Sequence, residues 1–76
     1  MAADTTLDAK GLNCPLPILR AKKAIKDVPA GGTLGVLATD PGSVADFEAF
    51  CRATGHGLLE SVEEGGVYRF VIQNNK

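Results

Sequence analysis

Two prolines spaced two residues apart restrict where the first helix of this chain can begin. They stand in the run Gly11-Leu12-Asn13-Cys14-Pro15-Leu16-Pro17. Proline is tolerated in the first turn of a helix, because the amides of that turn have no partner within the helix. Pro15 and Pro17 therefore predict a helix start, with Cys14 at or beside the N-cap. The unpaired amides and the positive end of the helix dipole favour a thiolate at that place.

The hydrophobic pattern predicts six elements in the order βαβαββ. Strands are indicated by alternation or short apolar runs, and helices by apolar residues three or four apart. The expected strands are Thr6–Ala9, Thr33–Thr39, Gly57–Glu63 and Val67–Gln73, and the expected helices run from about Pro15 to Asp27 and from Pro41 to about Thr54. Glu64-Gly65-Gly66 predicts a hairpin turn. We predict an α+β fold, a two-layer α/β sandwich with a four-stranded mixed sheet, two helices on one face, and residues 1–76 as a single domain.

The expected topology brings two loops together. A strand, a helix and a strand in succession predict a right-handed parallel unit. Both helices then begin at the carboxyl ends of the first two strands, the edge where ligands of α/β sheets tend to lie. Asp40 is the expected N-cap of the second helix. We therefore expect Cys14 and Asp40 to be neighbours in space.

The first predicted helix has one apolar face and one basic face. The apolar face predicts burial of Ile18, Ala21, Ile25 and Val28. The basic face carries Arg20, Lys22, Lys23 and Lys26. Two interpretations remain open for these four charges, a solvated helix face or a surface that docks an acidic patch of a partner enzyme.

The second cysteine and the single histidine favour structural roles. Cys51 falls on the predicted apolar stripe of the second helix, formed by Val44, Phe47, Phe50, Cys51 and Thr54. Burial there raises the pKa of a thiol and lowers its reactivity. His56 follows the end of that helix, at the edge opposite Cys14, so a turn role is favoured over that of a catalytic base. Two cysteines and one histidine do not supply the four ligands of a structural zinc site, so we expect no metal.

Composition narrows the functional classes. The net charge is −1, Tyr68 is the only tyrosine and there is no tryptophan. Direct nucleic-acid binding is therefore disfavoured, because it relies on basic surfaces and stacking aromatics. There is no apolar run of the ~18 residues that a membrane span needs and no leader-like start, and the cysteines suggest a reducing compartment, so a cytoplasmic location is expected. The short polar ends, Met1–Thr5 and Asn74–Lys76, are expected to be loose.

The run from Leu7 to Pro17 resembles the signature of the TusA/SirA family of small sulfur carriers, which is a Cys-Pro-X-Pro motif after a short N-terminal strand. Further similarity lies in Thr39-Asp40-Pro41, Phe50-Cys51 and Gly55-His56, and about Thr6 to Ile72 can be aligned to the family. Asn13 and Leu16 replace residues that are charged in some members, which bears on the choice of partner.

The resemblance implies the fold predicted above and a sulfur carrier function. Cys14 would accept a persulfide sulfur from a cysteine desulfurase or a rhodanese-like donor and relay it to an acceptor protein, as in tRNA thiolation or sulfur oxidation. Pro15, Pro17 and Asp40 would support the site, without a cofactor. Such a chain is a sulfurtransferase-type persulfide carrier, expected to be monomeric, rather than an independent turnover enzyme.

Two other functional classes remain compatible with the sequence. A thiol redox sensor would oxidise Cys14 to a sulfenic acid or a mixed disulfide. A pure interaction module would bind a regulator through the basic helix face and would not need the thiol.

Overall fold

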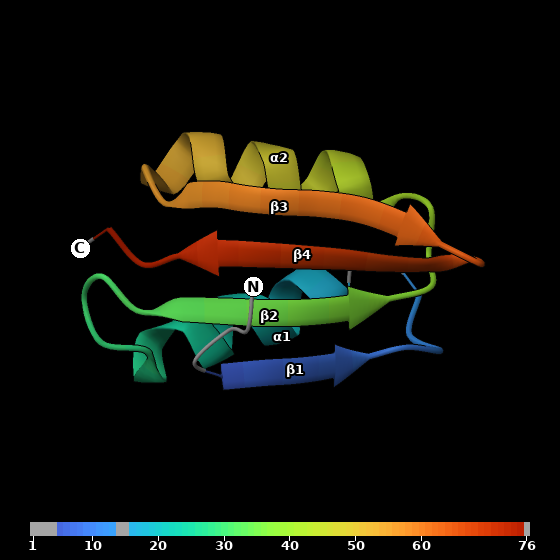
Figure 1. The fold of residues 1–76 in the computed structure, drawn as a ribbon, viewed down its shortest axis with the longest axis horizontal. Coiled ribbons are helices and arrows are strands. Elements are labelled where there is room, and N and C mark those ends of the chain that lie inside the picture. The colour runs from blue at the N-terminus through green and yellow to red at the C-terminus, as the bar shows by residue number, and fades with distance from the viewer. Residues whose placement is uncertain (1–4, 14–15, 76) are drawn as a thin grey trace.

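The fold is built around the parallel pairing of two short strands. The computed structural model describes residues 5–13 and 16–75. Cys14 and Pro15 lie outside the described residues. The elements are β1 (Thr5–Ala9), α1 (Leu16–Ala24), the 3-10 turn η1 (Ile25–Asp27), β2 (Thr33–Ala38), α2 (Ser43–Thr54), β3 (Gly57–Glu64) and β4 (Val67–Gln73). The predicted order βαβαββ is confirmed (Figure 1).

The four strands form one mixed sheet in the order β1-β2-β4-β3. β1 pairs with β2 in parallel, whereas β4 pairs antiparallel with both β2 and β3. Glu64 pairs with Val67, so the hairpin turn contains only Gly65 and Gly66. Both glycines have positive φ, 57° and 86°. A two-residue turn of this kind requires such values at both positions, which explains the glycine pair.

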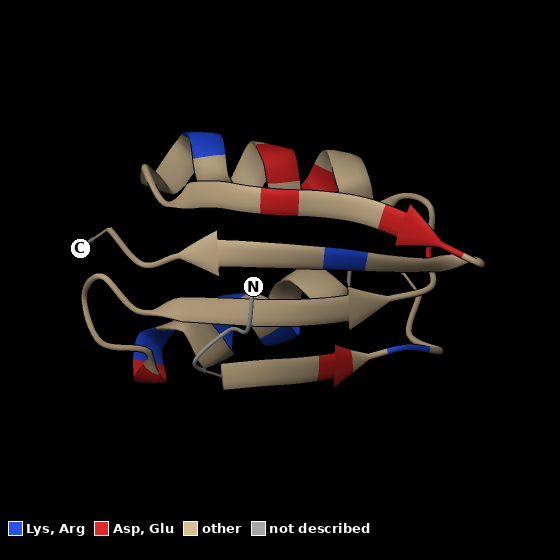
Figure 2. Ribbon diagram, in the orientation of Figure 1, with Lys and Arg blue, Asp and Glu red and all other residues tan. Residues whose placement is uncertain are grey.

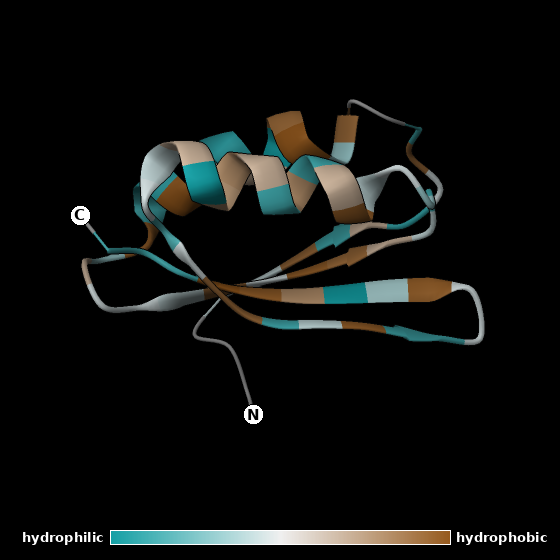
Figure 3. Cartoon of the chain, turned by 90° about the horizontal axis from the view of Figure 1, so that it is seen from above, coloured by the Kyte–Doolittle hydropathy of each residue, from teal (hydrophilic) through white to brown (hydrophobic). Residues whose placement is uncertain are grey.

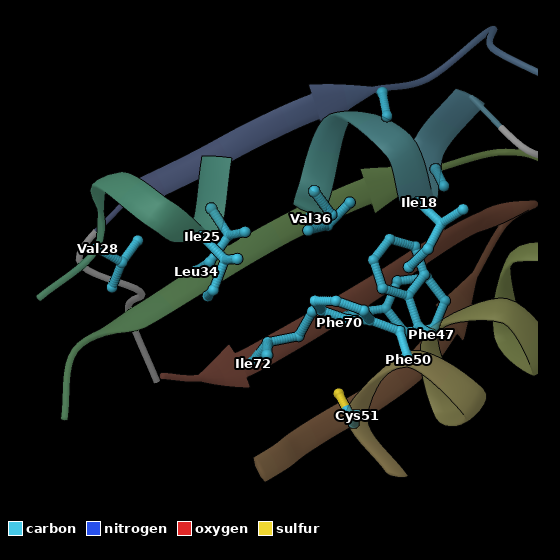
Figure 4. Packing of buried hydrophobic residues seen from close by; sticks show 13 residues of the cluster. Ile18, Ile25, Val28, Leu34, Val36, Phe47, Phe50, Cys51, Phe70 and Ile72 are labelled. Atoms are coloured by element: carbon cyan, nitrogen blue, oxygen red, sulfur yellow. The ribbon is translucent and has the colours of Figure 1, made fainter. Parts of the chain in front are cut away.

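Both helices cover the same face of the sheet, as predicted (Figure 3). The core lies between the two layers (Figure 4). At its centre the rings of Phe47 and Phe70 stack with centroids 4.6 Å apart. The predicted apolar face of the first helix is confirmed, because Ile18, Ala21 and Ile25 are all buried. Burial of these side chains is the main term that holds the helices to the sheet.

The first helix ends in a tighter turn than expected. The α-helical hydrogen bonds stop at Ala24, and Ile25–Asp27 form a 3-10 turn closed by the amide of Val28, which donates to the carbonyl of Ile25 at 3.1 Å. Val28 itself is extended. It precedes Pro29, and the ring of a proline disfavours the α conformation of the residue before it. The last turn therefore tightens before the chain leaves the helix.

The second helix begins at Ser43, two residues after the predicted start at Pro41. Asp40 is not its N-cap, a position that Gly42 occupies without a side-chain hydrogen bond. Instead the Asp40 carboxylate accepts the amide of Gly42 at 3.2 Å, and the Asp40 carbonyl accepts the amide of Ser43 at 3.0 Å. Aspartate favours such local turns as readily as helix caps. The helix ends where predicted, since Gly55 follows Thr54 with a φ of 83°. Thr54, expected on the buried stripe, is exposed.

The C-terminal segment is anchored, so the prediction of a loose end was wrong for Asn74 and Asn75. Asn74 is buried, and its side-chain amide donates to the carbonyl of Val28 at 2.6 Å. Its backbone amide donates to Gly32 at 2.9 Å and its carbonyl accepts from Gly31 at 2.7 Å. The asparagine therefore joins the end of β4 to the segment that links the first helix to β2. Lys76 lies outside the described residues.

Replacing Asn74 with alanine is expected to lower the free energy of unfolding by about 1–3 kcal/mol. The substitution leaves the buried carbonyl of Val28 without its donor, and an unsatisfied buried polar group costs about that much. Urea denaturation measures the loss. Asn75→Ala is the control, because it removes an exposed bond from Asn75 to Gly55 and should cost less. An equal loss in both variants would contradict the anchoring role of Asn74.

Candidate functional site

Two loops meet at the edge of the sheet where β1 and β2 end. The amide of Gly11, in the loop after β1, donates to the hydroxyl of Thr39, in the loop after β2, at 2.9 Å. Gly11 adopts a φ of 82°, a left-handed conformation that glycine reaches without strain. The predicted meeting of the two helix-start loops is confirmed. The expected closeness of Cys14 to Asp40 involves a residue outside the described part and stays a prediction.

The described residues on either side of Cys14 and Pro15 start the first helix. The carbonyl of Asn13 accepts the amide of Leu16 at 2.8 Å. Pro17 lies in the first turn of α1, as predicted, and its side chain is fully buried. The second proline of the motif therefore packs the beginning of α1 into the core, which fixes the helix start relative to the sheet.

The side of α1 that faces solvent is partly apolar. Leu16 is 45% exposed and Leu19 is 50% exposed. Arg20 and Lys23 are also exposed and stand three or four residues from these leucines, so the four share one side of the helix. We name the surface formed by Leu16, Leu19, Arg20 and Lys23 the outer face of α1. Both leucines fall opposite the buried stripe, so helical spacing alone could have predicted this surface.

The four basic residues of the predicted docking surface divide into two pairs. All four are exposed. Arg20 and Lys23 belong to the outer face of α1, whereas Lys22 and Lys26 line a groove between α1 and α2. Figure 2 shows basic residues on α1, whereas α2 carries both acidic and basic residues.

Cys51 is a core residue, as predicted. It is buried on the side of α2 that faces the sheet, and it is not part of a disulfide (Figure 4). Desolvation by burial raises the pKa of its thiol. The thiolate, which is the nucleophilic form, is therefore disfavoured at this position.

His56 lies at the far end of α2 from Asp40. It follows Gly55, the residue that ends the helix, and it is 7% exposed. Its Nδ1 accepts the backbone amide of Asn75 at 3.2 Å, and its ring centroid is 5.7 Å from that of Phe50. The twelve residues of α2 span about 18 Å. These positions confirm the predicted place of His56, after the end of the second helix.

The hydroxyl of Ser43 is a polar group that sequence reasoning missed. Ser43 is 1% exposed, and its Oγ has no hydrogen-bond partner among residues 5–13 and 16–75. It is the first residue of α2, directly after the turn that Asp40 closes. A serine near a helix start is common, and local pattern does not reveal whether it is buried. The hydroxyl places one unsatisfied polar atom close to the edge where the two loops meet.

Residues 5–13 and 16–75 contain no group of three histidine, cysteine or acidic side chains arranged to hold a metal ion. Neither helix in that part of the chain is long and apolar enough to cross a membrane. The site as described therefore consists of two loops, the start of α1 and the outer face of α1.

Comparisons with known proteins agree with this arrangement. A family model described as Sulfurtransferase TusA matches residues 5–74. The sulfur carrier protein TusA of Allochromatium vinosum is 58% identical over 72 residues, which cover 95% of each chain. The protein of the same name from Pseudomonas fluorescens is 44% identical over 75 residues, which cover 99% of this chain and 90% of that protein.

A solved structure shares the fold. The crystal structure of a SirA-like protein from Desulfitobacterium hafniense superposes with a TM-score of 0.82 at 31% identity, over 95% of this chain and 99% of that one. The family match, the two carrier proteins and the shared fold all extend over nearly the full length of the chain. It therefore belongs to the TusA family of sulfur carrier proteins.

Proposed function

We propose that Cys14 is the residue on which this family member carries sulfur, as a persulfide. The chain has two cysteines. Cys51 is buried in the core with a raised thiol pKa, so it is neither accessible nor readily ionised. Cys14 stands between Asn13 and the first helical residue, Leu16, where helix amides favour an anion. The burial of Cys51 is the observation that carries this assignment.

The proposed chemistry is a thiolate exchange. The Cys14 thiolate attacks the terminal sulfur of a donor persulfide, a new S–S bond forms, and the S–S bond of the donor breaks to release the donor thiolate. Delivery reverses the roles, because an acceptor thiolate attacks the terminal sulfur on Cys14. Pro15 and Pro17 support the site by defining the helix start, and Asp40 supports it from the neighbouring loop. The exchange needs no cofactor.

A carrier of this kind works between partner proteins. The proposed donor is a cysteine desulfurase or a rhodanese-like protein, and the acceptor is a protein of tRNA thiolation or of sulfur oxidation. The single domain acts as a monomer in the cytoplasm and does not itself contact nucleic acid. The outer face of α1 adjoins Asn13 along the chain and combines exposed leucines with positive charge. It therefore suits an acidic partner surface with an apolar centre.

Incubation with a cysteine desulfurase and L-cysteine is expected to add the mass of one sulfur atom to the protein. Intact-mass spectrometry without reductant measures the gain, and a reductant should remove it. Cys14→Ser abolishes the gain, because it removes the accepting thiol. Cys51→Ala is the matched control and keeps the gain, since the smaller apolar side chain still occupies the core.

The same experiment separates the alternatives. A gain that survives in Cys14→Ser and is lost in Cys51→Ala would contradict the assignment. No gain from either a desulfurase or polysulfide, with Cys14 still open to alkylation, would favour the redox sensor or the interaction module.

Replacing Asp40 with asparagine is expected to speed alkylation of Cys14 at neutral pH about two- to fivefold. A negative charge beside the thiol disfavours the thiolate, and asparagine removes that charge while keeping an oxygen for the amide of Gly42. Iodoacetamide rates across pH measure the effect. Glu48→Gln, an exposed change further along α2, is the control. An unchanged or slower rate in Asp40→Asn would show that Asp40 does not act on the thiol through its charge.

Charge reversal on the outer face of α1 is expected to slow sulfur transfer. At low ionic strength the double variant Arg20→Glu/Lys23→Glu should associate about tenfold more slowly with the desulfurase, and added salt should shrink the difference, because steering by exposed charges is screened. Stopped-flow transfer kinetics measure this. Lys22→Glu/Lys26→Glu changes the net charge equally but lies toward the groove, so it should have the smaller effect. If the two double variants slow association equally, or if neither slows it, the assignment of the outer face of α1 as the docking surface is wrong.

A further inference from the structure

A groove of about 830 Å³ runs between α1 and α2 on the helical side of the molecule. Its apolar lining consists of Ile18, Ile25, Ala49, Phe50 and Ala53. A volume of this size falls in the range of small-molecule sites, which are lined mostly by apolar groups with a few placed polar ones. Nothing in the proposed sulfur chemistry uses this groove.

The polar groups of the groove concentrate at one end. Lys22 lies in the last turn of α1 and Lys26 lies in η1, and both line the groove. His56 and Asn74 line it as well. The side chain of Asn74 reaches the carbonyl of Ile25 at 3.4 Å, so the end of β4 lies against the end of the first helix. The two lysines and His56 therefore share the edge where both helices end.

His56 presents a hydrogen-bond donor to the groove. Its Nδ1 accepts the amide of Asn75, so Nδ1 carries no proton and the proton of the neutral ring is on Nε2. His56 is 7% exposed and lines the groove, and Nδ1 rather than Nε2 is the ring nitrogen that bonds the backbone of Asn75. Nε2–H can therefore donate a hydrogen bond to an acceptor held in the groove.

Three backbone carbonyls at this end of the groove already accept hydrogen bonds from other groups, so they compete less with a bound anion for the two lysines. The carbonyls of Ile25 and Val28 accept the side-chain amide of Asn74, and the carbonyl of Cys51 accepts the amide of Gly55. The negative ends of both helix dipoles are thereby partly compensated. Asp46 also lines the groove, but it lies in the first turn of α2, near the opposite end. The positive charge of the groove thus lies at the end that Lys22 and Lys26 line.

We propose that this groove binds a small anionic amphiphile. The apolar body of the ligand lies over Phe50 and the small residues of α2, and its anionic head lies between Lys22, Lys26 and the Nε2–H of His56. The orientation follows from the position of Lys22 and Lys26, which lie at one end of the groove. This binding activity is separate from sulfur carriage and does not involve Cys14.

Titration with decanoate, followed by amide chemical shifts, tests the proposal. Decanoate should bind at least tenfold more tightly than decyltrimethylammonium, which has the same chain length and the opposite charge. The largest shifts should fall on residues of the groove, such as Ala53 and His56. Side-chain nitrogen spectra should show the proton on Nε2 and a shift of that nitrogen on binding. Equal affinity for the two ligands, no binding of either, or shifts confined to the open face of the sheet would overturn the proposal.

Variants on one helix supply the matched control. Lys22→Glu/Lys26→Glu should weaken decanoate at least tenfold at physiological salt. Arg20→Glu/Lys23→Glu changes the net charge equally but lies outside the groove, and it should keep the affinity within about twofold, because salt screens distant charges. Amide spectra of each variant show whether it is folded. Cys14→Ser should bind decanoate like the unaltered protein, so this test and the test of sulfur carriage can fail separately. Equal weakening by both double variants would overturn the site.

Discussion

The parallel pairing of β1 with β2 determines where everything else in this molecule lies. Parallel neighbours end at the same edge, so the two helices that follow them must begin at that edge and finish at the other. One edge therefore gathers the helix-start loops, joined by the bond from Gly11 to Thr39. The opposite edge gathers the helix ends, His56 and the anchored Asn74. The proposed sulfur site and the polar end of the groove thus lie at opposite ends of the five paired residues of β1 and β2.

Helix α1 contacts three different environments, because successive residues turn by about 100° around its axis. Ile18 and Ala21 face the core, Leu16 and Lys23 face solvent beside the proposed carrier site, and Lys22 faces the groove. The same geometry explains how residues that are adjacent in sequence, Lys22 and Lys23, are assigned to different partners. In a domain of 76 residues, such division of one helix is how several surfaces are obtained from few elements.

Local periodicity predicted most of the fold. The order of elements, the buried stripe of the first helix and the core positions of Phe47, Phe50 and Cys51 on the second all follow from spacings that a sequence displays directly. Two misses, at the end of the first helix and the start of the second, reflect local turns, and the others depend on hydrogen bonds or packing between distant segments. Asn74 is polar and terminal, yet it is fixed by a carbonyl 46 positions earlier. The groove depends on the spacing that the sheet imposes on two helices. The role of Cys14 rests on sequence, since it lies outside the described residues.

The proposed carrier site and the proposed groove share α1, and this constrains how they can influence each other. The helix begins beside Cys14 and ends at the groove, and Pro17 packs its first turn into the core. A ligand held between Lys26 and His56 touches both helices at their ends, so any effect on the thiol has to pass through the position of α1 as a rigid element. Thermodynamic linkage then requires the effect of the ligand on sulfur loading and the effect of sulfur loading on ligand affinity to be equal. Whatever factor a bound anion applies to the equilibrium of sulfur loading, sulfur loading applies to the affinity for that anion.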